Sequence, residues 1–393
     1  MSQQLINRNL DLKRLRDEGY HIEVKGGYLV IHHIPYVNSN KETKYGKLVS
    51  KLELVNNTNV NPPKDHVIYF SGEYPHYADG TKIIGMHHQD NTQTFDEGVT
   101  INHSFSNKPK EGFTNYYDKV LSYVRIISHQ ALALDNTLTA TPFNVVIDDD
   151  VESVFYYLDT NSSRANINMI NAKFKNQKIA IIGLGGTGAY ILDLVAKTCV
   201  AEIHLFDGDE FLLHNAFRSP GAASNEMLGT KPKKVDYYAG IYGNMHKHIT
   251  PHGYYVAEHN LDELSQMTYV FICIDRNTAR KVVIDYLLKA KIPFFDVGLG
   301  VNTVDDTLIG TIRVTTGTEL RNEHLDTRVP FGENDNNEYG TNIQVADLNC
   351  LNAVMAVIKW KKMSGFYQDL ENEHHSTYSI NVAQLLNEET SAT

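Results

Sequence analysis

Residues 178–218 read KIAIIGLGGTGAYILDLVAKTCVAEIHLFDGDEFLLHNAFR. The stretch opens with the isoleucine-rich run Lys178–Ile182, which is typical of a strand buried on both faces. A glycine-rich turn follows, and the apolar segment after it, Ala189–Ala196, predicts a helix. A second predicted strand, Glu202–Phe206, ends on Asp207 and Asp209. Strand, glycine turn, helix, strand and acid together indicate a βαβ unit that binds a nucleotide.

The composition of the chain excludes several classes of protein. The 393 residues are 42% apolar and 21% charged, as in ordinary globular proteins, and carry a formal net charge of −11. This acidity argues against nucleic acid as a partner, because phosphate contacts need clustered Lys and Arg. No apolar run approaches the ~18 residues of a membrane span, and the N-terminus lacks the apolar core of a signal peptide. We therefore expect a cytoplasmic protein with neither a nucleic-acid nor a membrane partner.

Residues 1–160 predict an N-terminal α+β domain with a mostly antiparallel sheet, in which Gly26-Gly27 forms a tight hairpin. This domain has no cysteine, so it does not carry a protein as a cysteine thioester, and we expect a docking or binding role. Its histidine pairs lack metal-ligand spacing and are interpreted as turn residues. Helices are expected at residues 10–18 and 116–134, and strands at 48–55, 66–72, 81–86, 98–105 and 151–158.

Residues 161–393 predict an α/β domain with a doubly wound, mainly parallel sheet, because predicted strands alternate there with long helices. A long polar segment at residues 316–341 lacks any period, and residues 378–386 are expected to pack. Besides the opening unit, strands are expected at 254–257, 268–274, 294–297 and 308–314, and helices at 235–245, 278–291 and 346–363.

A glycine turn followed by an acid also suits a dinucleotide oxidoreductase, so later polar residues must decide the kind of nucleotide. Asn215 and Arg218 follow the second strand, and a group of lysines follows them. A triphosphate needs several such groups, whereas a hydride-transfer site does not. Asp275, at the end of a predicted strand, is suitably placed to hold Mg²⁺ against phosphates, and Arg280 to steady Asp275 or the phosphates. These residues favour ATP with Mg²⁺.

The ordered set GLGGTG, DGD, HNAFR, a lysine after a glycine, and CID resembles the ThiF/MoeB/E1 adenylating enzymes over roughly residues 164–363. The resemblance implies a Rossmann-like domain that adenylates the C-terminal carboxylate of a ubiquitin-like protein with ATP. It also implies a homodimer in which Arg164 reaches the partner subunit's nucleotide. The implied nucleotide-binding and catalytic residues are Gly183, Gly185, Gly186, Gly188, Asp207, Asp209, Asn215, Arg218, Asp275 (which also binds magnesium), and one of Lys231, Lys233 and Lys234, with Lys234 favoured and Lys233 second.

Two departures limit what the resemblance implies. The loop at residues 316–341 has no cysteine for a thioester, and Cys199, Cys273 and Cys350 fall within predicted elements or at their joins. Cys350 is the nucleophile candidate if any of them reacts. The paired CxxC motif is also missing, so no structural zinc is expected.

The whole chain resembles bacterial E1-like proteins encoded near ubiquitin-like genes, some of them in anti-phage defence. The expected partners are a ubiquitin-like tail and an E2-like protein. The alternatives are a scaffold that binds nucleotide and a ubiquitin-like tail without turnover, or an NAD/FAD-dependent oxidoreductase.

Overall fold

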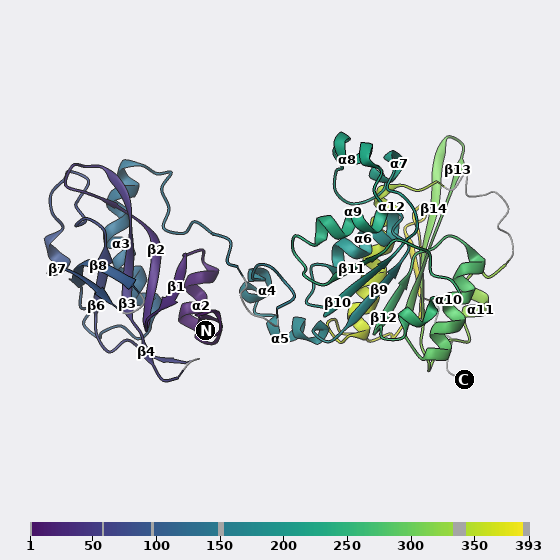
Figure 1. The fold of residues 1–393 in the computed structure, drawn as a ribbon, viewed down its shortest axis with the longest axis horizontal. Helices are drawn as coiled ribbons and strands as arrows, with labels where there is room; N and C mark the ends of the chain where they lie inside the picture. The colour runs from purple at the N-terminus through teal and green to yellow at the C-terminus, as the bar shows by residue number, and fades with distance from the viewer. Residues whose placement is uncertain (1, 57–58, 96–97, 148–152, 333–342, 388–393) are drawn as a thin grey trace. The chain divides into compact units, whose positions relative to one another are not determined.

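The computed structural model describes residues 2–56, 59–95, 98–147, 153–332 and 343–387. The chain divides into two compact units, residues 1–150 and 151–393, and Figure 1 shows the elements of each. Among the helices in this described part, none is long and apolar enough to cross a membrane.

The first unit is built on a six-stranded antiparallel sheet with the order β1-β2-β3-β6-β8-β7. Its main core lies between this sheet and α3 (Tyr116–Leu134), which packs against β2. The N-cap of α3 is Asn115, whose side chain accepts a hydrogen bond from the backbone N–H of Asp118 at 2.8 Å. The other elements are α1 (Ser2–Arg8), α2 (Leu10–Asp17), β1 (Ile22–Lys25), β2 (Tyr28–Val37), β3 (Thr43–Lys51), β4 (Glu53–Leu54), β5 (Val60–Asn61), β6 (Val67–Ser71), η1 (Ile84–Met86), β7 (His87–Phe95) and β8 (Val99–Ser106).

The predicted hairpin between β1 and β2 is confirmed. Gly26 and Gly27 have φ values of 54° and 79°, and both lie in the left-handed region that a two-residue hairpin turn requires. The helices predicted at residues 10–18 and 116–134 also form, the second with the predicted bounds.

Three predicted strands are wrong. Residues 84–86 form a short 3-10 helix whose Met86 is buried, and the strand is the polar segment after it, β7. Of residues 151–158, the described part begins at Ser153 and contributes an isolated bridge between Phe155 and His246. Residues 254–257 lie beyond the end of β11 (Ile249–His252), where the Tyr255 hydroxyl donates a hydrogen bond to Asp209. Several apolar side chains of these segments, among them Ile84, Tyr156 and Tyr255, are exposed, so apolar spacing alone does not make them strands.

The second unit contains an eight-stranded sheet with the order β11-β10-β9-β12-β13-β14-β15-β16. The strands from β11 to β13 are parallel, and β13 to β16 form an antiparallel extension. The expected α/β fold with a mainly parallel sheet is thus confirmed. The strands are β9 (Lys178–Ile182), β10 (Glu202–Phe206), β11, β12 (Tyr269–Ile272), β13 (Phe294–Val304), β14 (Thr307–Gly317), β15 (His375–Ser379) and β16 (Gln384–Asn387).

Helices cover both faces of the parallel strands, as Figure 1 shows. On β9, Ile179 and Ile181 pack on the side of α6, α9 and α12, whereas Ala180 and Ile182 pack on the side of α10. A strand buried on both faces explains its continuous apolar run. The helices of this unit are α4 (Thr160–Arg164), α5 (Asn168–Asn171), η3 (Ala172–Phe174), α6 (Gly186–Val195), α7 (Leu213–Ala216), α8 (Asn225–Thr230), α9 (Lys234–Tyr242), η4 (Leu261–Leu264), α10 (Asn277–Ala290), α11 (Leu325–Arg328) and α12 (Ala346–Met363).

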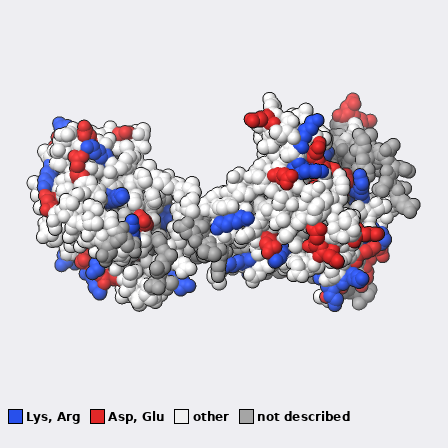
Figure 2. Space-filling model, viewed as in Figure 1, with Lys and Arg blue, Asp and Glu red and all other residues white. Residues whose placement is uncertain are grey.

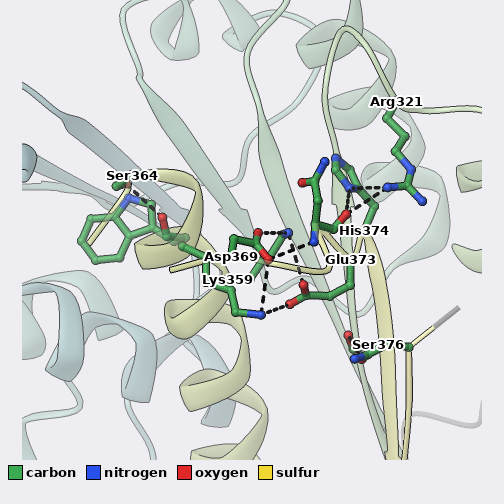
Figure 3. Close-up of polar contacts among 11 residues, drawn as sticks. Arg321, Lys359, Ser364, Asp369, Glu373, His374 and Ser376 are labelled. Carbon is green, nitrogen blue, oxygen red and sulfur yellow. Dashed lines mark hydrogen bonds and ion pairs between the residues drawn. The ribbon is translucent and has the colours of Figure 1, made fainter. Parts of the chain in front are cut away.

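Ion pairs tie the chain after α12 back to that helix (Figure 3). Lys359 Nζ lies 3.1 Å from Asp369 Oδ2, and Lys362 Nζ lies 2.8 Å from Glu373 Oε1. Because Glu373 comes shortly before β15, these pairs help to return the chain as a strand beside β14. In the predicted polar loop, Arg321 donates a hydrogen bond to the Asn372 carbonyl at 2.9 Å. This loop is therefore attached to the same segment before β15 that the two ion pairs hold. The loop also contains α11, and its residues 333–341 lie outside the described residues.

Candidate functional site

A cavity of about 770 Å³ lies at the carboxyl ends of the parallel strands in the second unit. Ligands of open α/β sheets bind at this edge, where the strand order reverses. Its lining includes the glycine turn after β9, the acids after β10, the chain after β12, and the hairpin formed by β13 and β14, with further residues from α9 and α12. The cavity therefore collects residues that are far apart in the sequence.

The glycine turn depends on close approaches that no side chain permits. Gly183 has φ 89°, and a Cβ at Gly188 would lie 1.9 Å from the Gly183 carbonyl oxygen. A Cβ at Gly186 would lie 1.9 Å from Asn349 Nδ2 on α12. Gly185, Gly186 and Thr187 line the cavity, so the first turn of α6 presents its free N–H groups there. A helix start of this kind is suited to binding an anion.

The two acids after β10 have different surroundings. Asp207 is 6% exposed, and its carboxylate accepts backbone hydrogen bonds from Leu184 at 2.6 Å and Asp209 at 2.9 Å. Asp207 thus fixes the glycine turn to β10. The Asp209 side chain is 51% exposed and accepts hydrogen bonds from Lys234 and Tyr255. Burial raises the pKa of the Asp209 carboxyl, but these hydrogen bonds outweigh it and hold the pKa below its usual value. The same bond to Asp209 raises the pKa of Tyr255 to about 12.

The three candidate lysines are placed differently. Lys234 lines the cavity at the start of α9, with Nζ 2.7 Å from Asp209 Oδ2 and 3.6 Å from Asp207 Oδ2. Lys233 donates to the Gly208 carbonyl. Lys231 ends α8 in a left-handed conformation (φ 47°) and is exposed. Among the described residues, Lys234 is the member of this trio that lines the cavity, which supports the predicted choice.

Arg218 lines the cavity with a buried Nε that has no hydrogen-bond partner in the described structure. Burial lowers the pKa of its guanidinium, and the charge of Asp275 opposes that shift. Asn215 is 3% exposed, and its Oδ1 accepts the backbone N–H of Leu212 at 2.8 Å. Its carbonyl accepts the backbone N–H of Arg218 at 3.1 Å. In this structure Asn215 therefore shapes the turn that carries Arg218.

Asp275 follows β12, is exposed, and lines the same cavity. Its carboxylate is free to approach a metal ion held by phosphate oxygens. Within the described residues, no group of three or more His, Cys, Asp and Glu side chains is arranged to hold a metal ion by itself. Phosphate oxygens would therefore have to complete the coordination of Mg²⁺ at Asp275.

The structure assigns Arg280 a role that differs from the predicted one. Its Nε lies 2.9 Å from Asp296 Oδ1, and its other donors reach Asn277 Oδ1 and the carbonyls of Ile274 and Pro330. The prediction that Arg280 steadies Asp275 is wrong, because Asp296 is its ion-pair partner. Arg280 also lines the cavity, and a contact with phosphates stays a prediction. Asp296 is fully buried and also binds Arg313, with Arg313 Nη2 at 2.6 Å from Oδ2.

The sequence reasoning missed Asp296, Arg313 and Asn349. Arg313 lines the cavity from β14, and Asn349 lines it from α12, where it accepts a hydrogen bond from Thr187 at 3.1 Å. The sequence does indicate a role for Asp296 and Arg313, because each is a charged residue within an apolar strand pattern. A charge buried in this way needs a partner of opposite charge.

The cavity differs in charge from the chain as a whole. Five cationic side chains line it against three aspartates, whereas the chain has a net charge of −11. Figure 2 shows acidic and basic side chains intermingled over the face in view. The cationic excess of the cavity is therefore local, and it favours an anionic ligand.

Arg164 and Cys350 lie outside the cavity lining, as does Cys199. Arg164 ends α4 and is exposed, and a role in a partner subunit's site stays a prediction. Cys350 is partly buried on α12, and Cys199 Sγ lies 3.0 Å from the Asn171 carbonyl. Cys273 lines the cavity and is partly buried, and desolvation raises the pKa of its thiol far above the usual value, so a thiolate is disfavoured.

The fold and the cavity define a nucleotide-binding α/β domain of the doubly wound class. Residues 164–320 match the model of the ThiF family, and residues 10–160 match that of a domain of unknown function, DUF6791. The second unit thus contains a ThiF family domain, and this match supports an ATP-using adenylyltransferase of the E1-like kind. No curated protein matches the chain.

Several solved structures are similar in fold. Crystalline PaaA is 17% identical, with a TM-score of 0.46 over 58% of this chain and 80% of that one. Escherichia coli MccB with ATP is 16% identical (TM-score 0.44; 58% and 69% covered). E. coli tRNA N6-threonylcarbamoyladenosine dehydratase, TcdA, is 17% identical (TM-score 0.41; 52% and 92% covered). Similarities of this degree say nothing of what the present chain binds.

Proposed function

We propose that this chain is an activating enzyme that uses ATP to adenylate the C-terminal carboxylate of a ubiquitin-like protein. The observation that carries the proposal is the Arg218 guanidinium, whose buried Nε has no partner in the described structure. A buried N–H without a partner costs free energy comparable to a lost hydrogen bond, so a ligand that supplies an acceptor to Arg218 would be stabilised. A phosphate oxygen would accept the hydrogen bond from Arg218 Nε, in a cavity lined by more cationic than acidic side chains.

The other cavity residues fit the parts of a nucleoside triphosphate. Gly183, Gly185, Gly186 and Gly188 allow the phosphates to approach the first turn of α6. Asp209, with Asp207 behind it, would accept the ribose hydroxyls, and Lys234 and Arg218 would bind phosphates. Asn215 and Lys233 would support the turns that hold Arg218 and Lys234, since both bond to nearby backbone.

The proposed reaction needs no general base, because a peptide carboxylate is already ionised at neutral pH. A carboxylate oxygen forms a bond to the α-phosphorus, and the bond from that phosphorus to its bridging oxygen breaks. The products are an acyl-adenylate and pyrophosphate. The barrier arises from bringing one anion to another, and Arg218, Lys234 and the N–H groups of α6 would lower it by holding both in a cationic cavity. Bound Mg²⁺ would neutralise part of the phosphate charge, with Asp275 as its protein ligand.

The identity of the partners rests on the resemblance of the ordered motifs. We propose a ubiquitin-like protein as the acceptor, an E2-like protein as a further partner, and a homodimer in which Arg164 reaches the neighbouring site. The first unit would dock a partner, and the setting would be the bacterial cytoplasm, in antiviral defence. Residues 1–160 and 161–393 would then be the docking and adenylation domains.

Pyrophosphate exchange tests the proposed activity. The chain is mixed with ATP, Mg²⁺, labelled pyrophosphate and a candidate ubiquitin-like protein, and label entering ATP is measured. We expect exchange that depends on the ubiquitin-like protein and falls about 10²–10³-fold in Asp275→Ala. Asp285→Ala on α10 is the matched control, because its carboxylate pairs with Lys281 on the surface.

Each alternative function predicts a different result, either in the exchange assay or in a separate assay of the same protein. Exchange at the wild-type rate in Asp275→Ala would show that Asp275 does not have the proposed role of Mg²⁺ ligand. Binding of ATP and the ubiquitin-like protein without exchange indicates a scaffold, and turnover of reduced nicotinamide without ATP indicates an oxidoreductase. A non-reducing gel of the charged protein, with Cys350→Ala beside wild type, tests for a thioester.

A further inference from the structure

The antiparallel end of the second sheet has one apolar and one polar face. Val297, Val301, Ile312 and Val314 belong to the core clusters that include residues of α12. The opposite face of the β13–β14 hairpin carries the cross-strand pairs Asp296–Thr315, Gly298–Arg313 and Gly300–Thr311. Side chains alternate between faces along a strand, so these three pairs form one continuous polar strip. Gly298, Gly300, Thr311 and Arg313 of this strip line the cavity.

Among the described residues, Arg313 shares its ion-pair partner, Asp296, with a second arginine. Asp296 is shared between Arg280 and Arg313, at 2.9 Å and 2.6 Å. The other hydrogen bonds of the two arginines in the described structure go to neutral oxygens, including Thr315 Oγ1, which lies 2.6 Å from Arg313 Nη1. Within the described residues, two guanidinium ions thus share one carboxylate, which leaves one positive charge in excess. A largely buried charge without a counterion is costly, which argues for an anion on the cavity side.

Glycine at position 298 makes room for this arrangement. A Cβ at Gly298 would lie 2.8 Å from Arg313 Nη2 and 2.9 Å from Nε, so a side chain there would displace the guanidinium. A Cβ at Gly300 would meet nothing within 4 Å, so the strip beyond Arg313 is open. Asp296 and Thr315 occupy one hydrogen on each terminal nitrogen of Arg313. The Nε–H and one further hydrogen on each terminal nitrogen have no acceptor among the residues that the structure describes, so they remain for a ligand.

A separate observation places a ligand beside this strip. Asn352 lines the cavity from α12, is fully buried, and donates from Nδ2 to the Gly298 carbonyl at 3.0 Å. Its Oδ1 is buried without a hydrogen-bond partner among the described residues. An amide N–H of a peptide would satisfy that oxygen, whereas a phosphate has no such donor at neutral pH.

We propose that Arg313 is the specificity-determining residue that binds the C-terminal carboxylate of the acceptor peptide, and that Asp296 is its positioning residue. The inference rests on the proposed function and names the subsite of its second substrate. Arg313 would hold one carboxylate oxygen and leave the other free to attack. The glycines and threonines beside Arg313 leave space for an acceptor tail with small side chains.

A pair of small peptides tests the subsite without knowledge of the natural partner. N-acetyl-glycylglycine and its C-terminal amide differ only in the carboxylate, and each is titrated into the full chain with saturating α,β-methylene-ATP and Mg²⁺. Dissociation constants come from ligand-observed NMR, and affinity for the nucleotide is measured separately. We expect the acid to bind wild type about tenfold to a hundredfold more tightly than the amide. This preference should vanish in Arg313→Gln and partly return in Arg313→Lys, with nucleotide affinity unchanged within about twofold.

The variants separate the possible failures. Asp296→Asn should lower the acid-to-amide preference while leaving nucleotide affinity in place, which a general loss of folding would not do. Lys289→Gln, which removes an exposed charge on α10, is the matched control and should keep the full preference. A preference unchanged in Arg313→Gln, or absent in wild type, would overturn the role of Arg313. Weaker nucleotide binding in Arg313→Gln with an unchanged preference would assign Arg313 to the phosphates instead. If wild type fails to bind the nucleotide at all, the proposed function itself is wrong.

Discussion

The parallel and antiparallel halves of the second sheet contribute to the same cavity in different ways. The parallel half places its polar groups just beyond strand ends, as with Asp207 after β10 and Asp275 after β12. The antiparallel half places them along a strand face, as with Arg313 in the middle of β14. Residues beyond a strand end are held by turns, whereas residues on a strand face are held by their cross-strand neighbours. The two halves should therefore respond differently to substitution.

Charge is also balanced differently in the two halves. In the parallel half, Lys234 pairs with Asp207 and Asp209, and the acids Asp207, Asp209 and Asp275 are matched in number by the cations Lys234, Arg218 and Arg276. In the antiparallel half, two arginines share Asp296, so bases exceed acids. The first arrangement suits hydroxyl donors and a metal ion, and the second suits an anion. A cavity that contains both arrangements is suited to holding a nucleotide together with an acidic second substrate.

The largest effect is expected from Gly188→Ala in the parallel half. The new Cβ would lie 1.9 Å from the Gly183 carbonyl oxygen, so the turn must move or the protein must fail to fold. We expect no measurable ATP binding by calorimetry and a loss of about 4 kcal/mol or more in the free energy of unfolding. Gly240→Ala on α9 is the control, because its Cβ would meet nothing and alanine favours a helix. Equal ATP affinity in both variants would show that the turn does not contact the phosphates.

Asp296→Asn is the corresponding change in the antiparallel half. It leaves two buried guanidinium groups without a counterion, so we expect the free energy of unfolding to fall by about 3 kcal/mol in denaturant titrations. The control is Asp285→Asn, which breaks an exposed pair with Lys281 and should cost less than about 1 kcal/mol. If both variants lose the same stability, the buried charge of this half is not what holds the hairpin face in place.

Arg218→Gln should separate binding from stability. Because Arg218 Nε has no protein partner in the described structure, its loss should leave the melting temperature nearly unchanged or slightly raised. ATP affinity should fall about tenfold to a hundredfold, the value of a charge-assisted hydrogen bond. Lys231→Gln removes an exposed charge after α8 and should change ATP affinity by less than about twofold. A melting temperature that falls with unchanged ATP affinity would make Arg218 a structural residue.

The parallel half could be predicted from the sequence, and the antiparallel half largely could not. A buried parallel strand is a short apolar run, and its functional residues come directly after it, so β9, β10 and their glycines and acids are visible as one pattern. Lys234 and Asp275, which the sequence analysis places at the same sheet edge, both line the cavity.

The roles of Asp296, Arg313 and Arg280 depend instead on cross-strand register and on a helix from elsewhere in the chain. Register is set by pairing over the whole hairpin, which local spacing does not reveal. For the same reason the sequence suggests Asp275, which is close to Arg280 in the chain, as its partner. The structure instead pairs Arg280 on α10 with Asp296 on β13.

The smallest effect is expected from Asp209→Asn in the parallel half. Lys234 and Tyr255 hold the pKa of the folded Asp209 carboxyl below its unfolded value of about 3.9, despite the opposing effect of burial. A lowered pKa stabilises the folded state at pH values above the unfolded pKa, and this contribution disappears as the pH falls through the folded value. Since the side chain is 51% exposed, we expect less than about 1 kcal/mol. The melting temperatures of wild type and Asp209→Asn should therefore differ slightly at pH 7 and converge below about pH 4. The melting temperature of Tyr255→Phe should lie between them. A difference that grows in acid would show that Lys234 does not stabilise the ionised carboxylate.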